Sequence, residues 1–415
     1  IFIVTISNPN ANVALGNNTT HTYTIQDNDD PPTVQFNATS SSETEGTNGT
    51  LQVDLSAASA KDVTVNYAVQ AASTGTGGGT DYTLADGTLT ISAGSTTGNI
   101  TVTGADDALD EDDETVVVLL SSPGNSSLGT NTTHTFTITD NDATPTIQFN
   151  ATSSSKSEGT TDHTIQVDIS AAAGRDISVA FTVAAGTPAA TGSATDYTLA
   201  DGTLTITGNN GNTSNTIDFT MVDDALDEWG EQFVVTLSNS PTNATIGTNT
   251  THTLTITDND AEPTIDFALA TGSVAENVTP TTITANLSAA SGKDIAVYYA
   301  ITAGSPAATG SGTDYTLASD SLEITAGSTS GTISAVIVDD ALDENNEQVV
   351  VTLSGVGDNV TIGSTTPAHT LTITDNDDPP TIAFSAVNSA GNEAVTPVTM
   401  TAQLSGASGL DITAD

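Results

Sequence analysis

Carboxylates dominate the residues of this chain that could do chemistry, and they are concentrated in one repeated loop. The stretch DDALDEDDE at 106–114 places seven carboxylates in nine positions around Leu109. Two carboxylates about 4 Å apart repel each other by roughly 4 kcal/mol at an effective dielectric constant near 20. A folded loop of this composition therefore requires cations among its acids. The hexapeptide DDALDE returns at 223–228 and at 339–344, so the requirement is repeated along the chain.

The overall composition excludes several classes of partner. The chain has 415 residues, with 51 acidic residues against 4 Lys and Arg, which gives a formal net charge of −47. Nucleic acids and anionic membranes are recognised through many basic residues, so neither is expected as a partner. Cysteine is absent, which excludes disulfides and zinc–thiolate sites. No run of about 18 apolar residues occurs, so no membrane span is expected in this segment.

An internal repeat divides the chain into modules of about 115 residues. The triplet Asp-Asn-Asp occurs four times, with successive copies 113, 118 and 117 residues apart (140 − 27, 258 − 140 and 375 − 258), and proline follows each copy within a few residues. This period is the size of an independent domain and too long for a solenoid repeat. We expect a window on a longer repetitive protein, with the C-terminal part of a module at 1–30, complete modules at 31–143, 144–261 and 262–378, and the N-terminal part of a module at 379–415.

Short alternating segments within each period predict the fold class. Apolar and polar residues alternate over six segments of the first complete module, and Gly, Asn, Asp and Ser separate them. This pattern is typical of an antiparallel β-sandwich, and no helical periodicity of useful length is present. We therefore predict an all-β chain of immunoglobulin-like sandwiches of about seven strands, arranged as beads on a string with short proline linkers. The six segments are 51–55, 63–69, 88–91, 99–104, 115–120 and 134–139.

Nine acids recur at matching places in each complete module and form the candidate metal ligands. In a sandwich these places come from an early strand, two loops and the exit of the last strand, which can meet at one end of the domain. Many carboxylates without nitrogen or sulfur ligands suit a hard cation, and calcium tolerates such loop sites better than magnesium does. We expect two or more calcium ions per module, with Leu109, Leu226 and Leu342 pinning the loop to the core. The 27 candidates are Glu45, Asp81, Asp106, Asp107, Asp110, Glu111, Glu114, Asp140 and Asp142; Glu158, Asp196, Asp223, Asp224, Asp227, Glu228, Glu231, Asp258 and Asp260; and Glu276, Asp314, Asp339, Asp340, Asp343, Glu344, Glu347, Asp375 and Asp377.

The order of these acids resembles the Calx-beta family, which is named from the sodium–calcium exchangers. The shared pattern is an early Glu, an Asp before an aromatic residue, an Asp-Asp pair with Glu four and seven residues after its second Asp, and acids at the last exit. The resemblance covers essentially the whole chain and implies a seven-stranded sandwich with calcium at one end. It carries the ligand role to the acids above, apart from Asp110, Asp227 and Asp343. The one departure is the Asn in the middle of the exit triplet, at Asn141, Asn259 and Asn376, which predicts that one ion is weakened or lost.

Histidines occupy one repeated position, as His21, His134, His252 and His369. In HTFTI each alternates onto the face of the following apolar residues, which predicts a place at the edge of the core and not a metal ligand or a base. We expect no nucleophile in register with these histidines and therefore no enzyme. Paired carboxylates can hydrolyse glycosides, but that chemistry needs one substrate cleft and these acids recur in every module.

Three of the four basic residues also share one position, each followed by Asp: Lys61, Arg175 and Lys293, with Leu410 in the last fragment. Two interpretations are open. The side chains bridge to acids of a neighbouring module, or they are solvated, and the sequence alone favours the solvated interpretation.

A structural function accounts best for the repetition. We expect a calcium-stiffened array in an extracellular or cell-surface adhesin, fibre or matrix protein, with neighbouring modules and calcium as partners and self-association into a fibre as a further expectation. A regulatory calcium-sensor array and a glycan- or receptor-binding module are the alternatives. The single Trp229 provides no repeated sugar platform. Acidity as an adaptation to high salt is disfavoured, because such charge would not keep one register.

Overall fold

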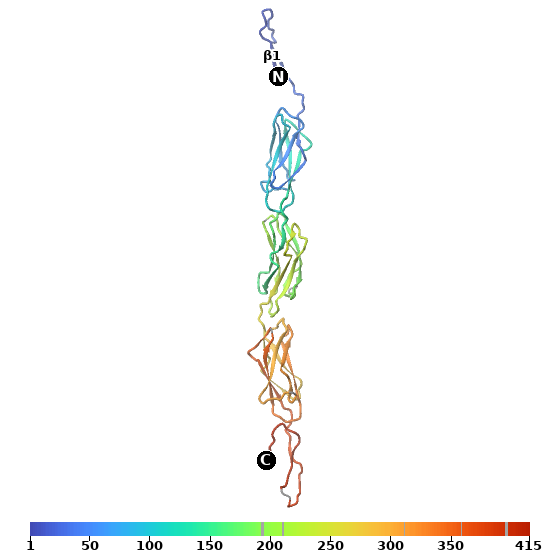
Figure 1. Ribbon diagram of the computed structural model, residues 1–415, viewed down its shortest axis with the longest axis vertical. Coiled ribbons are helices and arrows are strands. Elements are labelled where there is room, and N and C mark those ends of the chain that lie inside the picture. The colour runs from blue at the N-terminus through green and yellow to red at the C-terminus, as the bar shows by residue number, and fades with distance from the viewer. Residues whose placement is uncertain (192–194, 210, 311, 358, 395–396) are drawn as a thin grey trace.

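The chain is an all-β protein, as the sequence predicts. The computed structural model describes residues 1–191, 195–209, 211–310, 312–357, 359–394 and 397–415, and no helix occurs among them. Three β-sandwiches follow one another along the long axis of the molecule, with the two chain ends near its opposite ends (Figure 1). Within the described ranges, no helix is long and apolar enough to cross a membrane.

The first sandwich, module 1, consists of two five-stranded sheets. One sheet has the order β4-β12-β10-β6-β8 and the other the order β11-β3-β5-β9-β7. The strands are β3 (Thr33–Phe36), β4 (Ser40–Thr44), β5 (Gly49–Leu55), β6 (Val63–Val69), β7 (Tyr82–Thr83), β8 (Gly87–Ile91), β9 (Thr97–Gly104), β10 (Glu114–Gly124), β11 (Ser127–Leu128) and β12 (Thr133–Thr139).

Modules 2 and 3 repeat this arrangement in their described residues. The sheets of module 2 have the orders β14-β23-β21-β16-β18 and β19-β15-β13-β22, with a separate pair β17-β20, and those of module 3 the orders β25-β33-β31-β27-β29 and β28-β30-β26-β24-β32. The strands of module 2 are β13 (Thr146–Phe149), β14 (Ser153–Ser157), β15 (Thr164–Ile169), β16 (Ile177–Ala185), β17 (Tyr197–Thr198), β18 (Gly202–Ile206), β19 (Ser214–Asp218), β20 (Thr220–Met221), β21 (Glu231–Leu237), β22 (Thr245–Ile246) and β23 (Thr251–Thr257). Those of module 3 are β24 (Thr264–Phe267), β25 (Thr271–Ala275), β26 (Thr281–Leu287), β27 (Ile295–Ala303), β28 (Tyr315–Thr316), β29 (Asp320–Ile324), β30 (Ser330–Ile337), β31 (Glu347–Val356), β32 (Thr361–Ile362) and β33 (Ala368–Thr374).

Alternation along the longer strands, such as β5 and β12, explains why the sheets pack in pairs. In β12 every second side chain is buried, beginning at His134, and the residues between them lie nearer to solvent. Such alternation places all apolar side chains of a strand on one face. Phe36 and Val53 of the opposite sheet are completely buried against that face. Each module has its own core cluster, so the three sandwiches are separate packing units.

The strand count of module 1 exceeds the expected number of about seven, for a physical reason. The first strand of the sandwich is split: β3 pairs antiparallel with β5 in one sheet, and β4 pairs parallel with β12 in the other. The chain therefore changes sheets between Phe36 and Ser40. Two further strands, β7 and β11, are only two residues long.

The segments at the two chain ends form small hairpins of their own. β1 (Phe2–Thr5) pairs with β2 (Thr20–Tyr23), and β34 (Ile382–Phe384) pairs with β35 (Ala402–Leu404). All side chains of these four strands are exposed.

Candidate metal centre

Parallel pairing of β4 with β12 brings the first ligands together. Thr44 and Thr139 are paired partners at the ends of these strands, and the N–H of Glu45 donates to the carbonyl of Thr139 at 3.1 Å. Both strands therefore end at the same end of the sandwich, and the residues that follow them enter a common space. Asp140 and Asp142 leave β12 at this point, opposite Glu45.

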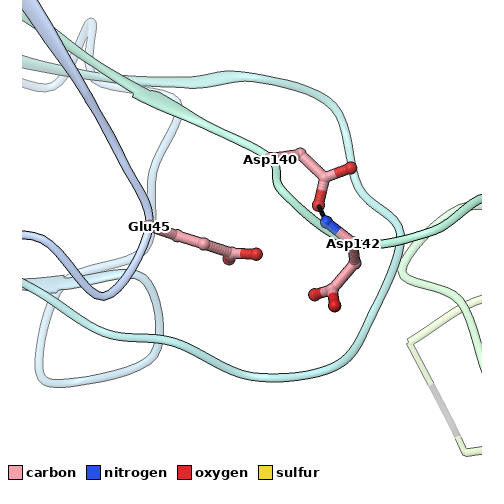
Figure 2. A group of neighbouring side chains, drawn as sticks. All are labelled: Glu45, Asp140 and Asp142. Carbon is pink, nitrogen blue, oxygen red and sulfur yellow. Dashed lines mark hydrogen bonds between the residues drawn. The ribbon is translucent and has the colours of Figure 1, made fainter.

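Three carboxylates converge there in every module. One oxygen from each of Glu45, Asp140 and Asp142 lies within 4.8 Å of the other two. Figure 2 shows the three side chains around one space, with the N–H of Asp142 donating to Asp140 Oδ1 at 3.3 Å. We name these groups the exit clusters. Their counterparts are Glu158, Asp258 and Asp260 in module 2 and Glu276, Asp375 and Asp377 in module 3.

A second group of acids lies at the same end of module 1. One oxygen from each of Asp81, Glu111 and Glu114 lies within 4.8 Å of the other two. Asp81 directly precedes β7, whereas Glu114 begins β10, so separate loops supply this group. In the other modules Glu231 contacts Asp196, and Glu347 contacts Asp314, through side-chain hydrogen bonds. The same pairing of an Asp with the last Glu of the loop is thus repeated.

Burial and mutual repulsion raise the pKa of six glutamates at these sites to about 7. For Glu45, burial is the main cause and the neighbouring Asp142 adds to it. Burial likewise leads for Glu114, followed by the charge of Asp81. The cation-free clusters therefore retain protons near neutral pH, which is the expected response of carboxylates crowded together without a cation. The six residues are Glu45, Glu114, Glu158, Glu231, Glu276 and Glu347.

Unpartnered carboxylate oxygens provide the test of whether a cation fits. Asp142 Oδ2 is buried and has no hydrogen-bond partner among the described residues, and the same holds for Asp260 Oδ2 and Asp377 Oδ2. Leaving such a group unsatisfied costs free energy, so a buried, unpartnered carboxylate oxygen points to a missing partner. The clustered side chains are all carboxylates, and a hard divalent cation such as calcium fits this donor set.

Some acids of the repeated loop have local structural roles. Asp107 Oδ1 accepts a hydrogen bond from the N–H of Leu109 at 2.8 Å, and Asp224 and Asp340 do the same for Leu226 and Leu342. This side-chain-to-backbone contact fixes the turn after the Asp-Asp pair.

The asparagine of each exit triplet ties the last strand to this loop. Its side-chain NH₂ donates to the first Asp of the hexapeptide, at 3.5 Å for Asn141 with Asp106, 3.1 Å for Asn259 with Asp223 and 3.3 Å for Asn376 with Asp339. An ionised aspartate could not donate this bond. The departure at this position therefore has a structural role, and its predicted effect on the number of ions stays a prediction.

Comparison with known proteins places this geometry in a family. The family model of the Calx-beta domain matches residues 27–142, 140–260 and 258–378, which together span most of the chain. This chain belongs to the Calx-beta family. Calx-beta domains are non-catalytic, calcium-binding modules, and the chain contains three of them in tandem. The resemblance inferred from the acids is thereby confirmed.

Solved structures with a similar chain path include domains of Calx proteins. CBD12 from CALX1.2 is 20% identical, with a TM-score of 0.26, and covers 54% of this chain and 99% of its own. The calcium binding domain CBD12 of CALX1.1 is 17% identical, with a TM-score of 0.26, and covers 53% and 98%. The apo-form Calx CBD1 domain is 20% identical, with a TM-score of 0.26, and covers 28% and 100%. No curated protein matches the chain significantly. The family assignment therefore rests on the domain matches.

The repeated loop also forms the joint between Calx-beta modules, through a residue that was expected to bind metal. Leu109 is only half-buried, whereas Asp110 is buried, with 3% of its surface exposed. The expectation that Leu109 pins the loop to the core is therefore wrong, and the same holds for the half-buried Leu226 and Leu342. Asp110 forms a parallel β-bridge with Ala173 of module 2.

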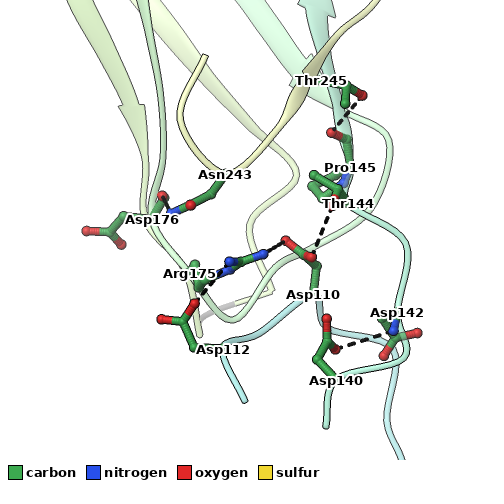
Figure 3. Close-up of polar contacts among 10 residues, drawn as sticks. All are labelled: Asp110, Asp112, Asp140, Asp142, Thr144, Pro145, Arg175, Asp176, Asn243 and Thr245. Atoms are coloured by element: carbon green, nitrogen blue, oxygen red, sulfur yellow. Dashed lines mark hydrogen bonds and ion pairs between the residues drawn. The ribbon is translucent and has the colours of Figure 1, made fainter. Parts of the chain in front are cut away.

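Arg175 completes the first joint. Its guanidinium contacts Asp110 Oδ2 at 2.5 Å and Asp112 Oδ1 at 3.0 Å, as Figure 3 shows. The hydrogen bond with Asp110 raises the pKa of Arg175. The solvated interpretation of this basic residue is wrong, and the alternative of a bridge to the neighbouring module is correct. Gly174 lies against Glu111, where a Cβ atom would overlap the glutamate side chain.

Lys293 has the same role at the second joint. Its Nζ donates to Asp227 Oδ1 at 2.6 Å, and only 9% and 3% of the two side chains are exposed. Ser291 Oγ donates to the carbonyl of Asp227 at 3.0 Å, and Lys293 Nζ lies 4.9 Å from the ring centre of Trp229. Sequence analysis missed Ser291 and Trp229 as joint residues, although the shared position of the basic residues was a signal. At the third joint Ser408 Oγ donates to the carbonyl of Asp343 at 3.3 Å, and Leu410 replaces the cation.

The structure separates the predicted ligands into those that converge and those that do not. Asp110 and Asp227 already have a cationic partner, and Asp343 contacts Ser408. Asp106, Asp107 and their counterparts lie in the loop beside the clusters but belong to none of the groups within 4.8 Å in the described part of the chain. Metal binding by any of the 27 acids remains a prediction.

The repeated histidines lie at the core edge in the three Calx-beta modules, as predicted. His134, His252 and His369 are 3%, 4% and 6% exposed, whereas His21 of the first hairpin is exposed. The expectation that no nucleophile lies in register is wrong for two modules. Ser41 Oγ lies 2.8 Å from His134 Nε2, and Ser154 Oγ lies 2.7 Å from His252 Nε2. Each serine lies on a strand that pairs in parallel with the strand of its histidine. The two residues are far apart in the sequence, so they form no local motif.

Proposed function

We propose that this chain is a calcium-stiffened segment of an extracellular or cell-surface adhesin, fibre or matrix protein. The observation that carries the proposal is the position of the unpartnered carboxylates. Asp142 Oδ2 lies in the exit cluster of module 1, and two residues later Thr144 Oγ1 reaches Asp110 of the joint at 3.4 Å. The proposed ion site and the joint therefore share one short segment.

The residues proposed to hold calcium are those of the exit clusters and of the second groups. Glu45, Asp140 and Asp142 would supply carboxylate oxygens from two strands, and Asp81, Glu111 and Glu114 would supply them from two loops. A bound calcium ion would neutralise charges that otherwise repel each other. Module 1 has two such groups among its described residues, and two or more ions per module stays a prediction. We propose that Asp110, Asp227 and Asp343 serve the joints instead.

A structural role fits the rest of the chain better than catalysis does. Repetition of one acidic pattern in every module argues for a material property, such as stiffness, that accumulates with module number. The joints provide contacts between neighbouring modules, so calcium would act on linkers that are already partly ordered. A high negative charge also keeps neighbouring chains apart unless a cation bridges them. We therefore include calcium-dependent self-association into a fibre as a secondary part of this proposal.

Small-angle X-ray scattering of the whole chain tests the proposed stiffening. We expect the distribution of overall lengths to become narrower when EDTA is replaced by millimolar calcium. The reason is that neutralised loops hold neighbouring modules in one orientation. Magnesium at the same concentration is the control and should have a much smaller effect.

The same titration separates the proposed role from the sensor alternative. A midpoint near millimolar calcium fits extracellular stiffening, and a midpoint at or below a micromolar fits a sensor. Identical scattering curves in EDTA and in calcium would contradict the stiffening, even if calcium bound.

A further inference from the structure

The three buried histidines differ in what faces their second ring nitrogen. In module 1, His134 Nδ1 lies 2.8 Å from the carbonyl of Ala38, and its Nε2 lies 2.8 Å from Ser41 Oγ. His252 has the same two contacts in module 2, at 2.7 Å each. A carbonyl can only accept, so Nδ1 has the proton and Nε2 accepts a hydrogen bond from the serine hydroxyl.

Module 3 lacks the serine. Gly272 pairs with Leu371 in the register in which Ser41 pairs with Phe136 and Ser154 with Leu254. His369 Nδ1 keeps its carbonyl contact, at 2.7 Å to Leu269.

The second nitrogen of His369 is left without a partner. In the described part of the chain its Nε2 has no hydrogen-bond partner, although the residue is only 6% exposed. A Cβ atom at Gly272 would lie 3.0 Å from Nε2, so this nitrogen faces the position that a side chain would occupy.

The space left by the serine opens into a pocket of about 180 Å³, which we name the His369 pocket. Its lining residues include His369, the hydroxyl-bearing Ser273, Thr282 and Thr284, and the apolar Leu371. A water molecule takes up about 30 Å³ of liquid, so the pocket has room for several waters or for one small organic molecule. An acceptor nitrogen among residues that have hydroxyl groups favours a ligand that itself has several hydroxyls.

We propose that the His369 pocket binds a small polyol or one ring of a sugar. One hydroxyl of the ligand donates to His369 Nε2 in place of the serine hydroxyl of modules 1 and 2, and the threonine hydroxyls contact the others. An anionic ligand is disfavoured, because Nε2 is an acceptor and the chain has a net charge of −47. A transition metal is disfavoured because the pocket offers a single nitrogen ligand.

The proposal does not depend on calcium. His369 lies near the start of β33 and Asp375 follows the end of that strand, six residues later. At the rise of an extended strand, this separation is about 20 Å. The two sites can therefore fail or succeed separately in experiments.

Nitrogen NMR of the whole chain with ¹⁵N-labelled histidine tests the proposal, with glycerol as the probe. We expect the Nε2 resonance of His369, assigned from its absence in His369→Gln, to shift and saturate at millimolar glycerol. His134 and His252 serve as internal controls and should not shift, because serine hydroxyls already occupy their acceptors. Equal shifts of all three histidines, or none, would overturn the proposal.

Substitution of Gly272 distinguishes specific binding of glycerol in the His369 pocket from weak, nonspecific association. Gly272→Ser restores the hydroxyl of the other modules and should weaken glycerol binding at least tenfold, and Gly272→Ala should do the same by occupying the space. Ser154→Gly in module 2 should have the opposite effect and make His252 responsive to glycerol. An unchanged response of His369 in both Gly272 variants would show binding at high additive concentration only and would contradict the proposal.

Discussion

At the scale of single residues, acids of the loop 106–114 have three different roles. Asp107 fixes the turn by accepting from the N–H of Leu109, Asp110 turns away from the cluster to meet Arg175, and Glu111 stays among the converging carboxylates. Position in the loop, and not residue type, decides which acid has a partner. The exit-cluster oxygens without partners are therefore the ones on which the calcium account depends.

Glu45→Gln tests the residue-scale account most simply. It removes one charge from the exit cluster of module 1 but keeps the side-chain shape, and hydrogen bonds and contacts to charged groups contribute about 1.5–3 kcal/mol. We therefore expect calcium affinity at this cluster to fall about 10–100-fold, while modules 2 and 3 keep theirs. Isothermal titration calorimetry of the whole chain should detect the loss as fewer tight sites.

Glu43→Gln is the matched control for that variant. Glu43 lies in β4, two residues before Glu45, and is exposed. It should leave the titration unchanged, because general negative charge is not what the account invokes. Equal losses in both variants would contradict a specific cluster and favour diffuse surface charge.

The raised pKa values predict how stability depends on pH in EDTA. Six glutamates have folded-state pKa values near 7, above the ordinary value of 4.5. Between these values the folded chain binds more protons than the unfolded chain, so the free energy of unfolding should fall as pH rises through this window. Melting temperatures at pH 5, 6 and 7 test the direction.

Calcium affinity should depend on pH in the opposite sense. Carboxylates must lose their protons to bind a cation, so affinity should increase from pH 5 to about 7 and then level off. Titration calorimetry at each pH measures this change. In the melting experiment in EDTA described above, melting temperatures that increased from pH 5 to pH 7 would contradict the prediction that the clusters hold protons.

At the scale of elements, alternation made most strands predictable. The segment 63–69 coincides with β6, and 134–139 lies within β12, because every second residue must be apolar to cover a shared core. The convergence of Glu45 with Asp140 was also inferable from their repetition in register. Parallel pairing of β4 with β12 is the element that produces it.

Some contacts between distant segments were not predicted. The sequence DDALDE suggested a buried leucine flanked by metal-binding acids, but Asp110 is buried beside Arg175 of the next module, which neutralises it. The Ser41–His134 contact was missed because the two residues lie on strands 93 positions apart. The alternation of apolar and polar residues within one strand does not say which strand will lie beside it.

Lys293→Met tests the joint as an element. The substitution keeps an apolar stem but leaves Asp227 buried without its cation, and breaking a buried pair costs about 3–5 kcal/mol. We expect the joint between modules 2 and 3 to open while each sandwich remains folded. The chain has no cysteine, so spin labels at Thr205→Cys and Glu323→Cys would be its only thiol attachments, and pulsed electron resonance between them should give a broader distance distribution.

Lys156→Met is the control for that experiment. Lys156 pairs with Asp162 within module 2, where the aspartate side chain is 66% exposed, so its removal should leave the distances unchanged. A narrow distribution that persisted in Lys293→Met would mean that packing alone holds the joint.

At the scale of the whole molecule, the negative charge and the linear arrangement of modules are related. Three Calx-beta modules follow one another along one axis (Figure 1), and the net charge of −47 lies on a chain with only four basic residues. Two of these basic residues, Arg175 and Lys293, lie at joints. There they pair with buried aspartates and reduce the repulsion between neighbouring modules. The remaining repulsion is between the carboxylates of the clusters, and bound calcium would reduce it.

Thermal unfolding of the whole chain in EDTA, in millimolar calcium and in millimolar magnesium tests the central claim most directly. The account predicts a large rise in melting temperature that is specific to calcium, because the folded clusters bind the ion and the unfolded chain does not. Equal and small shifts with both cations would contradict it, and the acids of DDALDE would then be ordinary surface charge.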